Sequence, residues 1–342
     1  MPSLDIGIDL GTSTILVIDS KREKIIKEPS VVAVRKRTGE ILGIGGDVYR
    51  MVGRTPDTIE VIRPLEDGVI SDFRTTEVLI KHLLHRINYN QLVKPRICVC
   101  VPSGITGVES NAVINAAAAA GARKVYLIEE PVAAAIGAGV DLSKPDGNLV
   151  VDIGGGTCDI AVLSFNGIVC KTSLRVAGNK FDEAIIKYIR SNYNLLIGEK
   201  TAENIKIKLG SVYPGSEDLE GSAKGRDLVT GLPKQIMLRR SELIEPLLDV
   251  ASVIIREIQS VLEKTPPELA GDIRENGIVM TGGGSMLNGL DELITRNTRA
   301  RAYVAENAVE SVAIGTARSF AYLDKLYDGF AHITPPAHQQ EK

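Results

Sequence analysis

Two short segments of the chain place an aspartate, one or more glycines and a threonine between apolar stretches. The first segment is DIGIDLGTSTILVI at residues 5–18, with Asp9, Gly11 and Thr12; the second is VVDIGGGTCDIAV at 150–162, with Asp152, Gly154–Gly156 and Thr157. Glycine has no side chain, so several backbone N–H groups can crowd around one ligand, and concave turns of this kind bind phosphate. A glycine-rich hairpin turn that binds nothing is the alternative.

The two segments repeat one plan about 140 residues apart, which predicts an internal duplication with one turn in each half. One glycine turn is weak evidence for a ligand site, whereas two matched turns favour phosphate binding. Polyphosphates bring Mg²⁺, a hard cation that prefers oxygen ligands, so Asp9 and Asp152 are the predicted magnesium residues. Turn capping is the alternative for either aspartate alone.

Length and composition fit a soluble α/β protein with two hydrophobic cores. The chain has 342 residues, 44% of them hydrophobic, and a net charge of −3 that does not indicate a nucleic-acid partner. The longest run of small apolar residues, Ala116–Ala120, is far too short to span a bilayer. The first residues lack the basic and apolar regions of a signal peptide and lead directly into a strand.

Cysteine and histidine spacings predict no metal centre. Cys98 and Cys100 lie on one predicted buried strand, and Cys158 and Cys170 are isolated, so neither a zinc spacing nor a disulfide framework occurs. A reduced cytosolic protein is the simplest interpretation. His82 and His85 share a face of a predicted helix, and a solvated or packed pair is favoured over a metal site.

Apolar periodicity predicts alternating strands and helices. Strands follow one another over residues 4–34, with EPSVVAV (28–34) as the third. The remaining predicted strands are 96–102, 124–131 and 276–284, and the predicted helices are 75–87, 107–122 with Gly121 at its end, 179–193, 246–264 from Pro246 to Lys264, and 311–323. We therefore expect two α/β halves, each built on a largely central sheet, with insertions at 33–65 and 179–242. A cleft between the halves would collect both glycine turns.

A series of motifs in family order covers nearly the whole chain: GIDLGT, EPSVVAV, RMVGRTP, IRPLEDGVISDF, VPSGIT, LIEEPVAAAIGAG, VDIGGGTCDIAV, TAENIKIKLG, TPPELAGDI and TGGGSMLNGLDEL. With these motifs the sequence resembles the actin, sugar-kinase and heat-shock-ATPase superfamily, and within it the MreB/Mbl family of bacterial actins. The resemblance implies an actin-like ATPase fold, in which two duplicated α/β domains flank a nucleotide cleft and each carries a small inserted subdomain. The implied subdomains are IA at 1–32, 66–144 and 314–342; IB at 33–65; IIA at 145–178 and 243–313; and IIB at 179–242.

The same resemblance implies binding of ATP or ADP with Mg²⁺. The residues that it places around the phosphates are Gly11, Thr12, Ser13 and Thr14 in the first turn and Gly154, Gly155, Gly156 and Thr157 in the second. Those that it places around the nucleoside are Gly178, Asp182, Glu203, Lys206, Gly282, Gly283 and Met286. A solvated ion pair three residues apart on one helix is the alternative for Glu203 and Lys206. Thr14 and the Cys158-Asp159 pair depart from the family pattern, without removing a glycine or an acidic residue of the site.

Hydrolysis requires an oriented water in line with the γ-phosphorus, and one carboxylate and one hydroxyl can position it. The resemblance assigns these roles to Glu130 and Thr157. An acidic pair before Pro131, Glu129 and Glu130, can instead serve only the N-terminus of a helix.

The resemblance also implies filaments of paired protofilaments at the inner face of the cell membrane. They would organise cell-wall elongation and maintain rod shape with a transmembrane shape protein as partner. Leu92 and Val93, flanked by Lys94 and Arg96, suit an anionic lipid surface, and packing over a neighbouring helix is the alternative. Two other functions remain on this fold. A small-molecule kinase would need a further catalytic aspartate, and a chaperone ATPase would need a peptide-binding domain.

Overall fold

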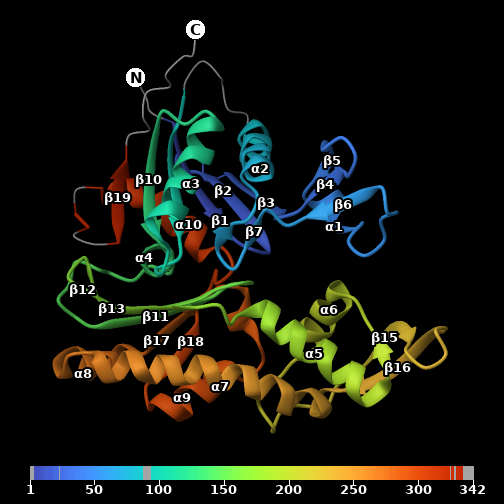
Figure 1. Ribbon diagram of the computed structural model, residues 1–342. Helices are drawn as coiled ribbons and strands as arrows, with labels where there is room; N and C mark the ends of the chain where they lie inside the picture. Colours follow the sequence, from blue (N-terminus) through green and yellow to red (C-terminus); the bar gives the residue numbers. More distant parts are fainter. Residues whose placement is uncertain (1–3, 23, 88–93, 324, 327–328, 334–342) are drawn as a thin grey trace. The chain divides into compact units, whose positions relative to one another are not determined.

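The computed structural model describes residues 4–22, 24–87, 94–323, 325–326 and 329–333. The chain forms two compact units, which are described separately. Unit 1 comprises Met1–Pro145, Leu163–Ile168 and Val309–Lys342, and unit 2 comprises Asp146–Val162 and Val169–Ala308. Each unit is built around one large sheet covered by helices (Figure 1).

The large sheet of unit 1 has the strand order β19-β10-β9-β1-β2-β3. Its strands are β1 (Asp5–Leu10), β2 (Thr14–Asp19), β3 (Lys24–Pro29), β9 (Arg96–Val101), β10 (Lys124–Glu129) and β19 (Phe330–Ile333). Strand β1 pairs antiparallel with β2 and parallel with β9, so the turn after β1 lies in the middle of the sheet.

Helices cover both faces of this sheet (Figure 1). They are α2 (Phe73–Arg86), α3 (Gly107–Ala119), α4 (Glu130–Gly137) and α10 (Ser311–Arg318). Strand β2 alternates between the faces: Ile15 and Val17 join the core under α2 and α3, whereas Leu16 and Ile18 pack on α10. Each such fully buried aliphatic side chain stabilises the unit by about 1.5–3 kcal/mol. This alternation of period two explains why the first apolar segment forms strands.

Smaller elements complete unit 1. A three-stranded sheet has the order β5-β4-β6 and a two-stranded sheet pairs β7 with β8. These elements are β4 (Val32–Arg35), β5 (Glu40–Ile44), α1 (Gly46–Tyr49), β6 (Ile59–Ile62), β7 (Leu65–Glu66), β8 (Val69–Ile70) and the 3₁₀ helix η2 (Ser319–Ala321).

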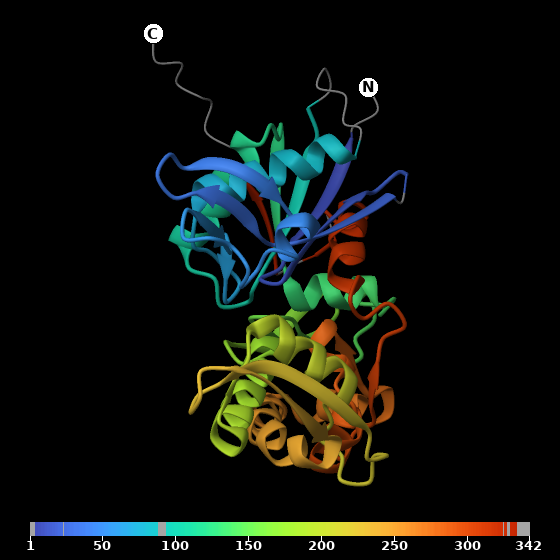
Figure 2. The same cartoon turned by 90° about the vertical axis from the view of Figure 1, so that its right-hand side faces the viewer.

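The large sheet of unit 2 has the order β13-β12-β11-β17-β18. Its strands are β11 (Asn148–Ile153), β12 (Cys158–Ser164), β13 (Gly167–Leu174), β17 (Ile278–Thr281) and β18 (Ala302–Val304). The helices are α5 (Gly178–Tyr193), α6 (Glu199–Leu209), α7 (Arg240–Lys264), α8 (Pro267–Asn276), the 3₁₀ helix η1 (Gly283–Met286) and α9 (Leu290–Thr298). A small sheet joins β14 (Leu195–Leu196), β15 (Glu220–Asp227) and β16 (Pro233–Arg239), and Figure 2 shows its long hairpin crossing in front of α5 and α6.

The predicted duplication is confirmed by the two strand orders. In unit 1, three consecutive strands (β1, β2, β3) are followed by β9 and then β10; in unit 2, β11, β12 and β13 are followed by β17 and β18 in the same relative places. The two glycine turns join β1 to β2 and β11 to β12, so they occupy equivalent positions. The α/β fold with two duplicated halves is therefore as predicted, and the finer division into four subdomains stays a prediction.

Several predicted elements were wrong at their ends. The predicted strand 124–131 ends at Glu129 because the next two residues begin α4, and the predicted strand 276–284 is shortened to Ile278–Thr281. EPSVVAV is not one strand, because the chain bends at Ser30, whose N–H donates to Ser13 O (3.0 Å), so β3 ends before it and β4 begins after it in another sheet. Helix α7 begins six residues before Pro246, since Arg239 N–H donates to Glu242 Oε1 (2.7 Å) and fixes an earlier start. The last helix ends at Arg318 and continues as the 3₁₀ helix η2.

Within the part of the chain that the structure describes, none of the helices combines the length and the apolar composition needed to cross a membrane.

Candidate functional site

Ser30 holds the first glycine turn in place through two hydrogen bonds. Ser30 Oγ donates to Gly11 O (2.6 Å), and Ser30 N–H donates to Ser13 O (3.0 Å), so two carbonyls of the turn are bonded within unit 1. A Cβ at Gly11 would lie 2.4 Å from Thr14 O, so only glycine fits there. Thr12 is buried and its Oγ1 accepts from Gly68 N–H (3.0 Å), which leaves its hydroxyl hydrogen to donate.

Asp9, at the end of β1, has a thiol neighbour that the sequence did not reveal. Cys100 Sγ donates to Asp9 Oδ1 at 3.2 Å. Burial raises the pKa of Asp9 to about 6, and the Cys100 hydrogen bond partly opposes this shift. Burial, followed by the charges of Asp9 and Glu130, raises the pKa of Cys100 well above its ordinary value, so the thiol keeps its proton and donates. The side-by-side pairing of β1 and β9 brings these residues together.

Glu130 is the first residue of α4, directly after β10, and only 8% of it is exposed. Its charge acts on Cys100, as does that of Asp9, so unit 1 gathers both predicted acidic residues around one thiol. Glu129 occupies the N-cap position of the same helix. A carboxylate in the first helical turn interacts favourably with the helix dipole. The position of Glu130 therefore fits both the helix-stabilising alternative and the catalytic prediction.

The second glycine turn, in unit 2, is held by the N-terminus of α5. Gly154 N–H donates to Thr157 O (2.9 Å) and closes the turn, while Gly178 and Asn179 donate their N–H groups to the carbonyls of Gly154 (3.0 Å) and Gly155 (2.8 Å). A Cβ at Gly178 would lie 3.1 Å from Gly154 O, which requires a small residue at this junction. Gly156 and Thr157 are buried. The predicted Gly178 therefore lies against the second glycine turn.

Asp152, the counterpart of Asp9, is 4% exposed and its Oδ1 accepts from Thr281 Oγ1 at 2.6 Å. Thr281 directly precedes the third glycine turn, on the strand β17 that pairs with β11 in the register Asp152↔Thr281. Sequence reasoning missed Thr281, because only the strand pairing places it beside the aspartate.

A partly buried ion pair lies next to the second turn. Lys206 Nζ, on α6, donates to Asp182 Oδ2 (2.8 Å) and to Gly178 O (2.9 Å). Burial raises the pKa of Asp182 to about 6, although Lys206 opposes this shift. Asp182 Oδ1 is buried and has no hydrogen-bond partner among the described residues. Lys206 is thus engaged by α5, and the partly buried Glu203 lies one turn earlier on α6.

The third glycine turn follows β17 and approaches the second turn closely. Gly282 has φ +80°, and a Cβ there would lie 2.3 Å from Ile153 O, so glycine is required for both reasons. A Cβ at Gly283 would meet nothing within 4 Å, and Met286 is 64% exposed. Open space beside Gly283 and a pliable exposed side chain give this turn room for a flat ligand.

The predicted residues thus form two sets. Unit 1 holds Asp9, Gly11, Thr12, Ser13, Thr14 and Glu130. Unit 2 holds Asp152, Gly154, Gly155, Gly156, Thr157, Gly178, Asp182, Glu203, Lys206, Gly282, Gly283 and Met286. Leu92 and Val93 lie outside the described residues. In each unit, glycine backbone, threonine hydroxyl and aspartate carboxylate meet at one turn, which is a donor and acceptor set suited to a polyphosphate and its cation.

Comparison with solved structures identifies the class of fold. The crystal structure of MreB 5 of Spiroplasma citri bound to AMPPNP is 38% identical, has a TM-score of 0.91 and covers 95% of this chain and 98% of that chain. A MamK double helical filament, 22% identical with a TM-score of 0.80 over 94% of this chain and 99% of that one, shows the same fold. The fold is that of the actin-like filament proteins.

Sequence comparison narrows this class to a family. The family model described as MreB/Mbl protein matches residues 3–328. The cell shape-determining protein Mbl of Bacillus subtilis (strain 168) is 49% identical over 94% of this chain and 97% of its own length. The cell shape-determining protein MreB of Escherichia coli (strain K12) is 46% identical over 95% of each chain. The chain belongs to the MreB/Mbl family, and the resemblance noted from its motifs is confirmed.

Proposed function

We propose that this chain is a cell-shape cytoskeletal ATPase that assembles into membrane-associated filaments with ATP and organises cell-wall elongation. The observation that carries the proposal is the repeated turn: equivalent positions of two matching sheets each supply an aspartate, glycine backbone and a threonine. Family membership supports a cytoskeletal role and does not favour the small-molecule kinase.

In this proposal, unit 2 binds the nucleoside and part of the polyphosphate. Gly154–Thr157 would donate backbone and hydroxyl hydrogens to phosphate oxygens, and the Lys206 ammonium adds positive charge beside that turn. The unpartnered Oδ1 of Asp182 and the open space at Gly283 fit a ligand with donor groups and a flat base. The MreB 5 structures of Spiroplasma citri contain AMPPNP or ADP, which supports binding of an adenine nucleotide here.

The residues of the two turns also fit Mg²⁺. Asp9 and Asp152 offer hard carboxylate oxygens, and a neighbouring donor orients each carboxylate: Cys100 for Asp9 and Thr281 for Asp152. When bound, the ion would neutralise negative charge on the polyphosphate. The raised pKa of Asp9 fits this role, because a carboxylate that burial destabilises is stabilised by a nearby cation.

Glu130 and Thr157 are the proposed catalytic residues. The buried Glu130 carboxylate of unit 1 would accept a hydrogen bond from an attacking water, and the Thr157 hydroxyl of unit 2 would help to orient such a water. Burial excludes competing solvent from both groups, since they are 8% and 7% exposed.

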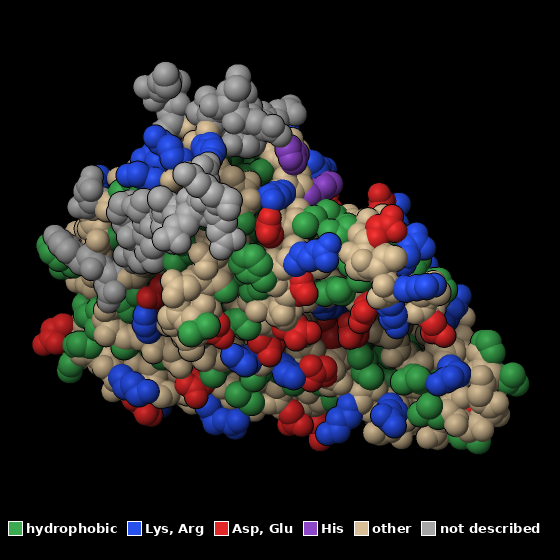
Figure 3. All heavy atoms as spheres, turned by 45° about the horizontal axis from the view of Figure 1, so that its top comes forward, with side chains coloured by type: hydrophobic (Ala, Val, Ile, Leu, Met, Phe, Trp, Pro, Cys, Tyr) green, Lys and Arg blue, Asp and Glu red, His purple; other side chains and the backbone are tan. Residues whose placement is uncertain are grey.

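Association with a membrane and with itself completes the proposal. Filament formation by MamK supports head-to-tail self-association, a heterologous contact that does not close. Lys94 and Arg123 are exposed, and their segments are adjacent because Arg123 N–H donates to Pro95 O (2.8 Å). Figure 3 shows several Lys and Arg side chains gathered at the upper left of the face that it draws. Lys94 and Arg123 would flank the Leu92-Val93 membrane contact at the inner face of the membrane, where a transmembrane shape protein would join the filament.

The first test is electron microscopy of the purified protein on anionic vesicles, with Mg-ATP and without nucleotide. Nucleotide-dependent filaments on the vesicles are the expected result. Persistent monomers with ATP, together with phosphate transfer to a small acceptor, would favour the kinase alternative. Replacing Leu92 and Val93 by serine should abolish vesicle co-sedimentation while nucleotide binding persists.

The catalytic assignment is tested with Glu130→Ala, and Glu129→Ala is the matched control. Glu130→Ala should bind nucleotide as the wild type does but hydrolyse it about 100-fold more slowly or worse, since loss of a proton-accepting group costs this much. Glu129→Ala should retain turnover. Normal turnover by Glu130→Ala would leave that residue only its helix-stabilising role.

A further inference from the structure

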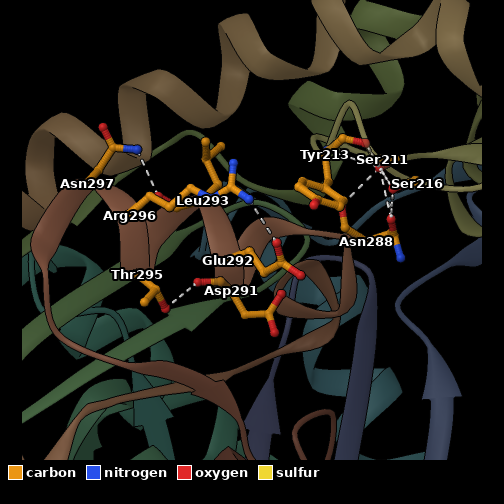
Figure 4. Close-up of polar contacts among 10 residues, drawn as sticks. All are labelled: Ser211, Tyr213, Ser216, Asn288, Asp291, Glu292, Leu293, Thr295, Arg296 and Asn297. Atoms are coloured by element: carbon orange, nitrogen blue, oxygen red, sulfur yellow. Dashed lines mark hydrogen bonds and ion pairs between the residues drawn. The ribbon is translucent and has the colours of Figure 1, made fainter.

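A compact polar cluster in unit 2 is not used by the proposed chemistry (Figure 4). Ser211 Oγ and Ser216 Oγ both donate to Asn288 Oδ1, at 2.9 and 2.6 Å, and the two serine oxygens lie 2.8 Å apart. Ser211 is fully buried and its Oγ also accepts from Tyr213 N–H (3.1 Å). Three side-chain oxygens from two distant chain segments thus form a closed triangle, which we call the Asn288 triangle.

The triangle connects the two segments that carry the predicted nucleoside residues. Ser211 lies five residues after Lys206, just beyond the end of α6, and Asn288 lies two residues after Met286, just beyond η1. The backbones are also joined there, because Val212 N–H donates to Asn288 O (2.9 Å). A Cβ at Gly210 would lie 2.9 Å from Leu287 Cδ1, so the two segments are already in close contact on this side.

Neighbouring contacts make the junction rigid. The Arg296 guanidinium stacks over the Tyr213 ring with 5.0 Å to the ring centroid and pairs with Glu292 (3.4 Å) one turn earlier on α9 (Figure 4). A Cβ at Gly289 would lie 2.3 Å from Tyr213 Cβ, so the loop after Ser211 closes tightly over the residue after Asn288. Several contacts therefore hold the Ser211–Ser216 loop against the Asn288 segment, and the triangle fixes which residues of the two segments face each other.

We propose that Asn288 is a positioning residue for nucleotide binding, which acts through Ser211 and Ser216 to fix the spacing between α6 and the Gly282–Met286 turn. The inference rests on the proposed function, because these two segments are the predicted walls of the nucleoside site. A shift of about 1 Å between two binding walls weakens a ligand that contacts both. The turn at Gly154–Thr157 has hydrogen bonds of its own from Gly178 and Asn179 of α5, so we expect the triangle to change affinity and to leave the hydrolysis step unchanged.

The test compares Asn288→Ala with the conservative Asn288→Asp and with Asn297→Ala as the matched control. Asn288 is exposed and its Oδ1 only accepts hydrogen bonds in the triangle, so aspartate can replace it there. Asn297 lies on α9, which begins two residues after Asn288, and its Nδ2 donates to Leu293 O (2.8 Å) within that helix, outside the triangle. For each full-length variant, the dissociation constant of a fluorescent ADP derivative, the KM for ATP, kcat and the melting temperature are measured.

Asn288→Ala should raise both the ADP dissociation constant and KM about fivefold, the equivalent of about one hydrogen bond, with kcat unchanged. Asn288→Asp and Asn297→Ala should match the wild type. A Asn288→Ala protein with wild-type affinity, or one that loses kcat at unchanged KM as a partly unfolded sample does, would overturn the inference. Failure of the wild type itself to bind the ADP derivative would instead contradict the proposed function. If Asn288→Ala does not fold, Ser216→Ala keeps the Ser211–Asn288 hydrogen bond, removes the other two contacts of the triangle and should give the same direction of change.

Discussion

The contact between α4 and α10 in unit 1 leads to a specific prediction for Gly315→Ala. A Cβ at Gly315 would lie 1.7 Å from Ala133 O, and one at Gly137 would lie 1.8 Å from Ser311 O. The two helices therefore cross backbone to backbone with a glycine on each side. The obstructing atoms belong to the main chain, so no change of rotamer can relieve the clash.

The cost follows from the separation that the added methyl group requires. The helices must move apart by roughly 1.5 Å to restore an ordinary van der Waals distance, and α10 also packs on β1, where a Cβ at Gly7 would meet Ala317 N at 2.5 Å. Overpacking of this kind costs about 1–3 kcal/mol, and we expect about 3 kcal/mol because both neighbours of α10 resist the shift. For a unit of this size the melting temperature should fall by about 6–12 °C.

Scanning calorimetry of the full-length protein measures this effect, with Gly107→Ala as a control in the same unit. A Cβ at Gly107, at the start of α3, would meet nothing within 4 Å, so alanine there should be neutral or stabilise by a few tenths of a kcal/mol. Since α4 begins with Glu130, Gly315→Ala should also lower ATP turnover at temperatures below the transition. A Gly315→Ala protein that melts with the wild type would refute the close crossing of the two helices.

Two further predictions concern the aspartates of the turns. Because burial raises the pKa of Asp9 from 3.8 to about 6, the nucleotide-free protein should lose stability as pH rises from about 4 through 6. Asp9→Asn should remove this loss. In urea unfolding it should be about 3 kcal/mol more stable than the wild type at pH 7.5 but equal to it near pH 3. Parallel pH profiles of the two proteins would contradict the burial of this carboxylate. Thr281→Val removes the 2.6 Å hydrogen bond to Asp152 and should cost about 1.5–3 kcal/mol of stability. It should also raise the Mg²⁺ concentration needed for half-maximal nucleotide binding. Thr298→Val is the control: the Thr298 hydroxyl donates to the backbone carbonyls of Ile294 and Ala300, so its loss should leave the Mg²⁺ requirement unchanged.

The sequence predicted the elements whose signals are local. The apolar stretches on both sides of the first glycine turn predicted two strands, and Gly121 correctly marked the end of α3 with φ +112°. The prediction failed where local signals are weak or misleading. Strand β3 carries three lysine and glutamate residues at a sheet edge and buries only Ile26, so its apolar pattern is faint. Pro246 suggested a helix start, but Leu243 packs in the core and the helix begins before it.

The candidate site divides in the same way. Residue type and spacing were enough to single out both aspartates and the glycine turns, because glycine next to Asp and Thr has a local chemical meaning. Glu130 was singled out only by the family resemblance. The partners that orient those groups could not be predicted from spacing: Cys100 reaches Asp9 only through the pairing of β1 with β9, and Thr281 reaches Asp152 only through that of β11 with β17.

The amino-acid sequence by itself determined the duplicated α/β plan and predicted the two glycine turns proposed to bind a polyphosphate, because apolar periodicity and glycine turns act over a few residues. Only the tertiary structure decided which groups face one another: Lys206 against Asp182 and Asn288 against Ser211 are contacts between segments 24 and 77 residues apart. Such contacts depend on how helices and strands pack. The packing of whole elements sets the distance between their side chains, and a local sequence pattern does not.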